Sequence, residues 1–133
     1  IPSGRACTAL RRCYPLQPAE AYRGQSCAGD LLSTSHFHID LNEKYIPGLC
    51  SGLAIDMADL GRPLPEGKYP LLNILSAKGI RGLYRMAKDE FDFWPRHKTY
   101  LNHCDLCTDI RGYLSGLEGQ GFAELAPSGF YPG

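Results

Sequence analysis

The sequence has no net charge, no long apolar run and few cysteines, and each shortage argues against a class of protein. Its 14 Lys and Arg residues balance 14 Asp and Glu residues, so no electropositive surface for nucleic acid or anionic membranes is expected. No apolar run reaches the roughly 18 residues that span a bilayer. Six cysteines in 133 residues lie below the roughly 8–10% of a disulfide scaffold. We therefore expect neither nucleic acid nor a membrane as a partner.

Markers of secretion are missing as well. None of Asn42, Asn73 and Asn102 begins an Asn-x-Ser/Thr sequon, and residues 1–13 lack the apolar stretch of a signal peptide. We therefore expect a cytoplasmic protein whose thiols ligate metal in preference to forming disulfide bonds. The chain begins with Ile1 and not with Met, from which we expect a processed product or a piece of a longer protein.

The remaining composition is that of one small, loop-rich globular domain. A chain of 133 residues approaches the roughly 150 residues of a single domain and is too short for a complete enzyme barrel. Hydrophobic residues make up 44% of the chain, and its 15 Gly and 10 Pro residues indicate many turns.

Residue periodicity predicts an α+β fold in which a small β-hairpin packs on two or three helices. Apolar and polar residues alternate over residues 32–40, a second extended piece follows at 45–46, and residues 41–44 form the turn. Such a hairpin is not stable alone and must pack on another element. Helices are expected over residues 70–79, 80–91 and 105–118, with a short helix within residues 3–12.

Four of the six cysteines form two pairs that could bind one metal centre. Cys104 and Cys107 lie within one turn of a predicted helix start, where the partial positive charge of the helix favours thiolates. Cys27 and Cys50 bracket the predicted hairpin, so its folding brings them together. Four thiolates suit tetrahedral zinc and a four-iron, four-sulfur (4Fe-4S) cluster alike, and their spacing does not separate the two.

Two stretches around these cysteines resemble the C-terminal auxiliary-cluster domain of radical S-adenosylmethionine (radical SAM) enzymes, the twitch domain, which is a shortened SPASM domain. The stretch SHFHIDLNEKYIPGLCSGLAI resembles the family's strand, turn and strand that end in a Pro-x-x-Cys-x-Gly element. The stretch NHCDLCTDIRGYL resembles its Cys-x-x-Cys element leading into a helix. The resemblance covers residues 2–118 and implies that a 4Fe-4S cluster is held by Cys27, Cys50, Cys104 and Cys107.

The resemblance also implies how the chain is divided. Residues 1–26, in which Gly4-Arg5-Ala6 resembles the family's exit from the barrel, would lead in from an upstream radical SAM barrel of the same parent chain. Residues 27–118 would form the twitch/SPASM-like domain, and residues 119–133 an irregular tail. An apolar patch that normally faces the barrel would then be exposed, and a dimer through that patch is expected.

No catalytic residue is assigned to this chain. The Cys-x-x-x-Cys-x-x-Cys motif of the radical-generating cluster is absent from the sequence, so S-adenosylmethionine would bind only in the missing barrel. The isolated chain is therefore not expected to be active. With four cysteines capping four irons, the resemblance implies electron transfer or bracing of the parent enzyme's active site, and not substrate coordination.

Three alternatives stay open at this point. The first is a structural zinc-binding interaction module, and an air-purified fragment is expected to accept zinc in any case. The second is a thioredoxin-like dithiol at Cys104 and Cys107, although no βαβ pattern precedes it. The third is a disulfide-stapled secreted domain.

Other candidate ligands receive no role in the site. Cys7 and Cys13 are interpreted as buried or free thiols, or as a disulfide formed on exposure to air. His36 and His38 have the spacing of a metal pair on a strand, but we expect them to face solvent. His103 is a candidate for a contact beside the ligands and not for a ligand itself.

Overall fold

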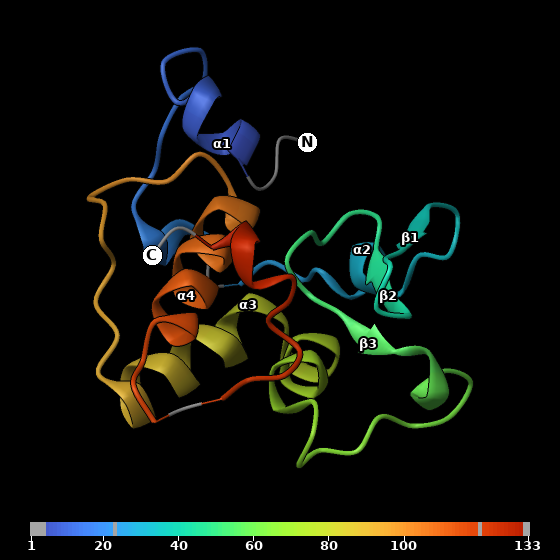
Figure 1. Ribbon diagram of the computed structural model, residues 1–133. Coiled ribbons are helices and arrows are strands. Elements are labelled where there is room, and N and C mark those ends of the chain that lie inside the picture. Colours follow the sequence, from blue (N-terminus) through green and yellow to red (C-terminus); the bar gives the residue numbers. More distant parts are fainter. Residues whose placement is uncertain (1–4, 23, 120, 132–133) are drawn as a thin grey trace.

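The computed structural model describes residues 5–22, 24–119 and 121–131, and within them the fold is α+β, as predicted (Figure 1). Gly4, in the predicted connection from a barrel, lies outside the described residues. Among the described helices, none is long and apolar enough to cross a bilayer. The elements, in chain order, are α1 (Arg5–Leu10), the 3-10 turn η1 (Ala19–Tyr22), α2 (Ala28–Leu32), β1 (Phe37–Ile39), β2 (Lys44–Pro47), β3 (Ile55–Asp56), η2 (Met57–Asp59), α3 (Pro70–Phe91), α4 (His103–Ser115) and η3 (Ser128–Phe130).

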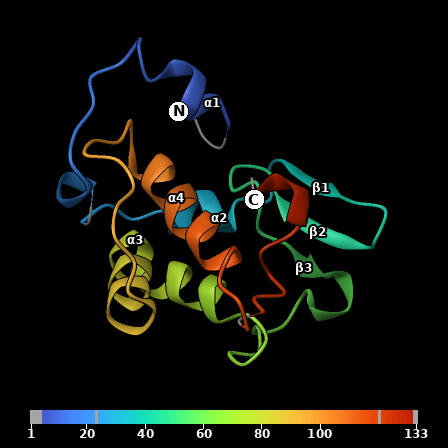
Figure 2. The same ribbon diagram turned by 60° about the vertical axis from the view of Figure 1, so that its left-hand side comes forward.

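The sheet has three antiparallel strands in the order β1-β2-β3, and not the two of the predicted hairpin. Phe37 pairs with Pro47 across the hairpin, and Tyr45 pairs with Ile55 of β3. With only two residues, β3 is too short to show alternation in the sequence. Figure 2 shows the sheet lying to one side of the helices, with β2 between the edge strands β1 and β3.

Helix α3 begins at Pro70, whose fixed φ suits the first turn of a helix. Gly79 interrupts it with a φ of 65° and a ψ of −157°, so the two helices predicted on either side of Gly79 form one kinked element. A Cβ at Gly79 would lie 3.2 Å from the carbonyl oxygen of Gln25. The glycine therefore lets the segment before α2 pass close to the kink.

Helix α4 starts earlier and ends earlier than predicted. The side chain of Asn102 caps it by accepting a hydrogen bond from the backbone N–H of Asp105 at 2.9 Å. The helix ends at Ser115, with Gly116 at its C-cap, and not at the predicted Gly119, which follows in a turn.

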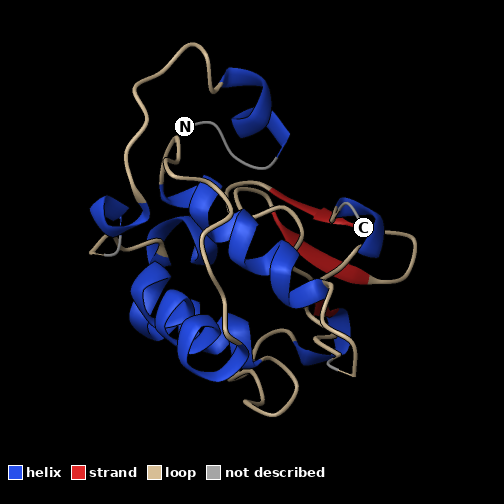
Figure 3. Ribbon diagram, turned by 90° about the vertical axis from the view of Figure 1, so that its left-hand side faces the viewer, coloured by secondary structure: helices blue, strands red, loops and turns tan. Residues whose placement is uncertain are grey.

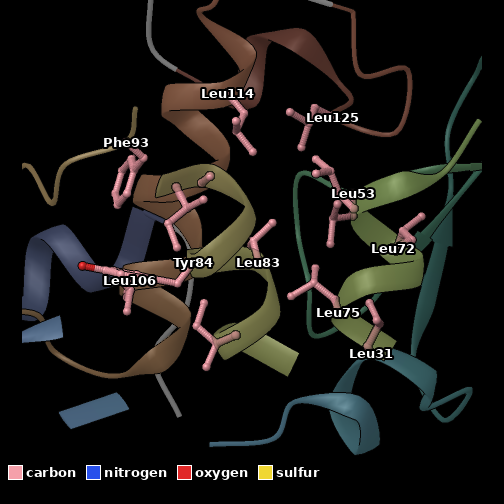
Figure 4. Packing of buried hydrophobic residues seen from close by; sticks show 14 of the residues in the cluster. Leu31, Leu53, Leu72, Leu75, Leu83, Tyr84, Phe93, Leu106, Leu114 and Leu125 are labelled. Atoms are coloured by element: carbon pink, nitrogen blue, oxygen red, sulfur yellow. The ribbon is translucent and has the colours of Figure 1, made fainter. Parts of the chain in front are cut away.

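The ribbon of Figure 3 shows how the helices pack beside the strands. The core lies where α3 and α4 face each other, and it extends to Leu53 in the segment before β3 (Figure 4). Arg11 joins the N-terminal segment to α4 through a 2.6 Å ion pair with Asp105. The C-terminal segment is also packed into the molecule, because Leu125 forms a bridge with Leu53. Buried residues at the centre include Leu71, Leu75, Ile80, Leu83, Leu106, Ile110 and Leu114.

Candidate metal centre

Three separate segments bring the four predicted cysteines to the wall of one cavity. Cys27 is the residue before α2, Cys50 lies in the turn after β2, and Cys104 and Cys107 occupy the first turns of α4. All four are free thiols of intermediate exposure. The apolar part of the wall consists of Leu31, Leu49, Leu53, Leu75 and Ile80.

Local structure explains how each cysteine reaches the cavity. The backbone N–H of Cys50 donates to the carbonyl oxygen of Pro47 at 3.2 Å, which turns the chain back at the end of β2. The kink at Gly79 admits the backbone just before Cys27. Cys104 and Cys107 are three residues apart on α4, so they lie on the same helix face.

Burial controls the protonation of three of these thiols. Burial, followed by the nearby thiol of Cys107, raises the pKa of Cys27 to about 11. Burial likewise raises the pKa values of Cys50 and Cys104 to about 12. The thiolate expected from the helix start is thus opposed at Cys104 by desolvation. Metal binding at this cavity has to displace protons from the thiols.

His103 also lines the cavity, and its Nε2 atom is buried with no hydrogen-bond partner within the described part of the chain. Burial lowers the pKa of its imidazole and so favours the neutral form. Its position beside Cys104 fits the expected contact next to the ligands.

A cation that the sequence analysis did not single out forms part of the same wall. The guanidinium of Arg111 donates from Nε to Sγ of Cys107 at 3.3 Å. It also donates from Nη1 to the carbonyl oxygen of Ser51 at 2.8 Å and to the hydroxyl of Tyr131 at 2.7 Å. The available signal was its place four residues after Cys107, on the inward face of a helix.

The four thiols suit a metal by type and by placement, but they do not surround one as they stand. In the described ranges, no three His, Cys, Asp or Glu side chains are arranged so that they could hold a metal ion. The cavity measures about 20 Å³, whereas a single water requires about 10–15 Å³. The α+β class is thus confirmed, while the described residues do not show the predicted four-cysteine metal site.

The remaining candidates do not line the cavity. Cys7 is buried in α1, with its Sγ 4.0 Å from Oδ1 of Asn102, and Cys13 is exposed. His36 and His38 are exposed, as expected, with their rings edge to face at a centroid distance of 4.8 Å.

No family model, curated protein or solved structure matches the chain.

Proposed function

We propose that the chain is the auxiliary iron-sulfur domain of a radical SAM enzyme. Cys27, Cys50, Cys104 and Cys107 would hold a 4Fe-4S cluster, for which four thiolates are the expected protein ligands. One observation carries the proposal: three segments far apart in the sequence place these four cysteines on the wall of a single cavity. The strand, turn and Cys-x-x-Cys stretches that resemble the twitch domain contain three of the four cysteines.

The residues around the thiols fit a buried redox or bracing centre. Leu53, Leu75 and Ile80 are almost fully buried, and they would exclude water from the bound group. When bound, a 4Fe-4S cluster supplies one-electron redox chemistry. Four thiolates leave no iron open to substrate, so the proposed role is electron transfer or bracing of the active site in a parent enzyme whose barrel binds S-adenosylmethionine.

A structural zinc module is the second candidate, and the size of the cavity favours it. A volume of about 20 Å³ is little more than a single water requires, and four iron and four sulfide atoms occupy more space than one zinc ion. Four cysteines bind zinc tetrahedrally, with Zn–S distances of about 2.3 Å. The two candidates use the same thiols and differ in acid-labile sulfide, which zinc sites lack.

The deciding experiment is to measure iron, zinc and acid-labile sulfide in the anaerobically purified chain. We expect iron with an equal amount of sulfide, lost when Cys27, Cys50, Cys104 or Cys107 is changed singly to Ser. Cys13→Ser is the matched control, because Cys13 is exposed and does not line the cavity.

The other outcomes are equally informative. Zinc without sulfide, even after attempted cluster reconstitution, would replace the iron-sulfur proposal with the zinc module. A wild-type chain that binds neither metal would contradict both. Metal retained in all four cavity variants would show that these cysteines are not the ligands.

A further inference from the structure

Arg111 is a buried cation at the wall of the cavity. The residue is 4% exposed, although charged side chains are rarely buried unless they are paired. None of the ion pairs found among the described residues includes Arg111. Its oxygen acceptors are neutral groups: the carbonyl of Ser51 and the hydroxyls of Tyr131 and Thr108. The positive charge is therefore not balanced by these contacts.

The remaining contact of the guanidinium is with the cavity itself. Nε donates to the sulfur of Cys107 at 3.3 Å, and this hydrogen bond becomes charge-assisted when the sulfur is a thiolate. The carboxylate of Asp30 on α2 acts electrostatically on other cysteines of the cavity, Cys27 among them, but it forms no ion pair with Arg111 among the described residues. The anions best placed to balance Arg111 are thus the thiolates of a metal-loaded site.

The same guanidinium connects the turn that carries Cys50 with the helix that carries Cys107. Ser51, whose carbonyl accepts from Nη1, directly follows Cys50, while Arg111 and Cys107 share α4. Tyr131 extends the link, because its hydroxyl accepts from Arg111 and donates to the carbonyl oxygen of Gly52 at 2.6 Å. A Cβ on Gly52 would lie 2.5 Å from that hydroxyl, so the backbone passes directly beneath it.

We propose that Arg111 is the counter-charge and positioning residue of the four-cysteine centre. Four thiolates around a dication carry two excess negative charges, and the guanidinium offsets one of them. Its hydrogen bonds also hold the turn after Cys50 against α4, so that the two cysteine pairs face each other. This inference rests on the proposed metal site and goes beyond it, because it assigns a role to a residue that is not a ligand.

The test compares Arg111→Met and Arg111→Lys with the wild-type chain, using Zn²⁺ alone as the probe. Affinity is measured by competition with a chromophoric chelator, and the fold is checked by far-ultraviolet circular dichroism without metal. We expect about a 10–100-fold weaker affinity in Arg111→Met, the range found when a partner of a ligand is removed. Arg85→Met is the matched control, since Arg85 is exposed on α3 and lies outside the cavity.

A second readout separates a charge effect from a merely structural one. In the iron-loaded chain, Arg111→Met is expected to shift the reduction potential to a more negative value, because a positive charge and an N–H···S contact are lost. Arg111→Lys keeps the charge and is expected to lie closer to the wild-type potential, while binding zinc more weakly than the wild type.

The outcomes distinguish this inference from the proposed function. A wild-type chain that binds no metal would contradict the proposed function and this inference with it. Normal wild-type binding together with unchanged affinity and potential in Arg111→Met would overturn only the role of Arg111. If Arg111→Met does not fold, Arg111→Lys decides, and wild-type zinc affinity in that variant would overturn the role of the guanidinium.

Discussion

Glu124 is a fully buried carboxyl group that caps α3 from a distant part of the chain. Its two carboxylate oxygens accept from the backbone N–H groups of Leu71 and Leu72, both at 2.8 Å. Burial raises the pKa of Glu124 to about 7, while these two hydrogen bonds act in the opposite direction. The helix N-terminus thus favours the ionised form of Glu124, while desolvation favours the protonated form.

This competition predicts that the free energy of unfolding depends on pH. The folded state holds the proton of Glu124 more tightly than the unfolded state, whose pKa is near 4.5. Protonated Glu124 therefore contributes to the free energy of unfolding fully below about pH 4.5, and this contribution is lost as pH rises through about 7. A pKa shift of this size corresponds to a change of about 3 kcal/mol in the free energy of unfolding.

The measurement is urea unfolding between pH 5 and 8. We expect the wild-type chain to lose stability over this range more steeply than Glu124→Gln, which cannot ionise. Comparing the two slopes removes the contribution of the histidines, since both chains carry the same four. Parallel slopes would contradict the raised pKa of Glu124.

At the scale of elements, the kink of α3 connects the helical core to the cysteine cavity. Gly79 has a φ of 65°, and the segment before Cys27 crosses it at close range. An ordinary helical residue at this position would be strained and would also press against the carbonyl oxygen of Gln25. The kink therefore helps to place Cys27 beside α4.

We expect Gly79→Ala to destabilise the fold by about 1–3 kcal/mol and to weaken zinc binding. Gly61→Ala is the control, because Gly61 has a φ of 83° with open space where its Cβ would lie. The Gly61→Ala variant therefore has a strained positive φ but no contact between the added Cβ and a neighbouring segment. Denaturant unfolding and the zinc competition assay measure the two effects, and equal zinc affinity in both variants would show that the kink does not position Cys27.

At the scale of the whole molecule, metal binding at the cavity would connect segments from all parts of the chain. The turn after β2, the start of α2 and the start of α4 each contribute to its wall. The N-terminal segment reaches α4 through Arg11, and the C-terminal segment reaches Arg111 through Tyr131. A bound metal would thus stabilise the fold as a unit by closing long loops.

Metal loading is therefore expected to raise the unfolding temperature of the chain. An ion at 100 times its dissociation constant adds about 2.7 kcal/mol to a folded state that alone binds it. Calorimetry with and without Zn²⁺ would show the increase in the wild-type chain and in Cys13→Ser, but not in Cys104→Ser. An equal increase in Cys104→Ser would mean that the ion binds elsewhere.

Much of the secondary structure followed from local signals in the sequence. The helical spacing after Pro70, the break at Gly79 and the turn between β1 and β2 each depend on residues close together in the chain. Helix α2 and strand β3 were not predicted, because each is five residues or shorter and too brief to show a period.

The α+β class and the two cysteine pairs could be predicted from the sequence, because periodicity and spacing are local properties. The folded structure was needed to show that the four cysteines share one cavity wall, that burial raises the pKa of three of them, and that Arg111 and Tyr131 lie beside them. These features arise from contacts between distant segments, whose distances and desolvation no local pattern contains.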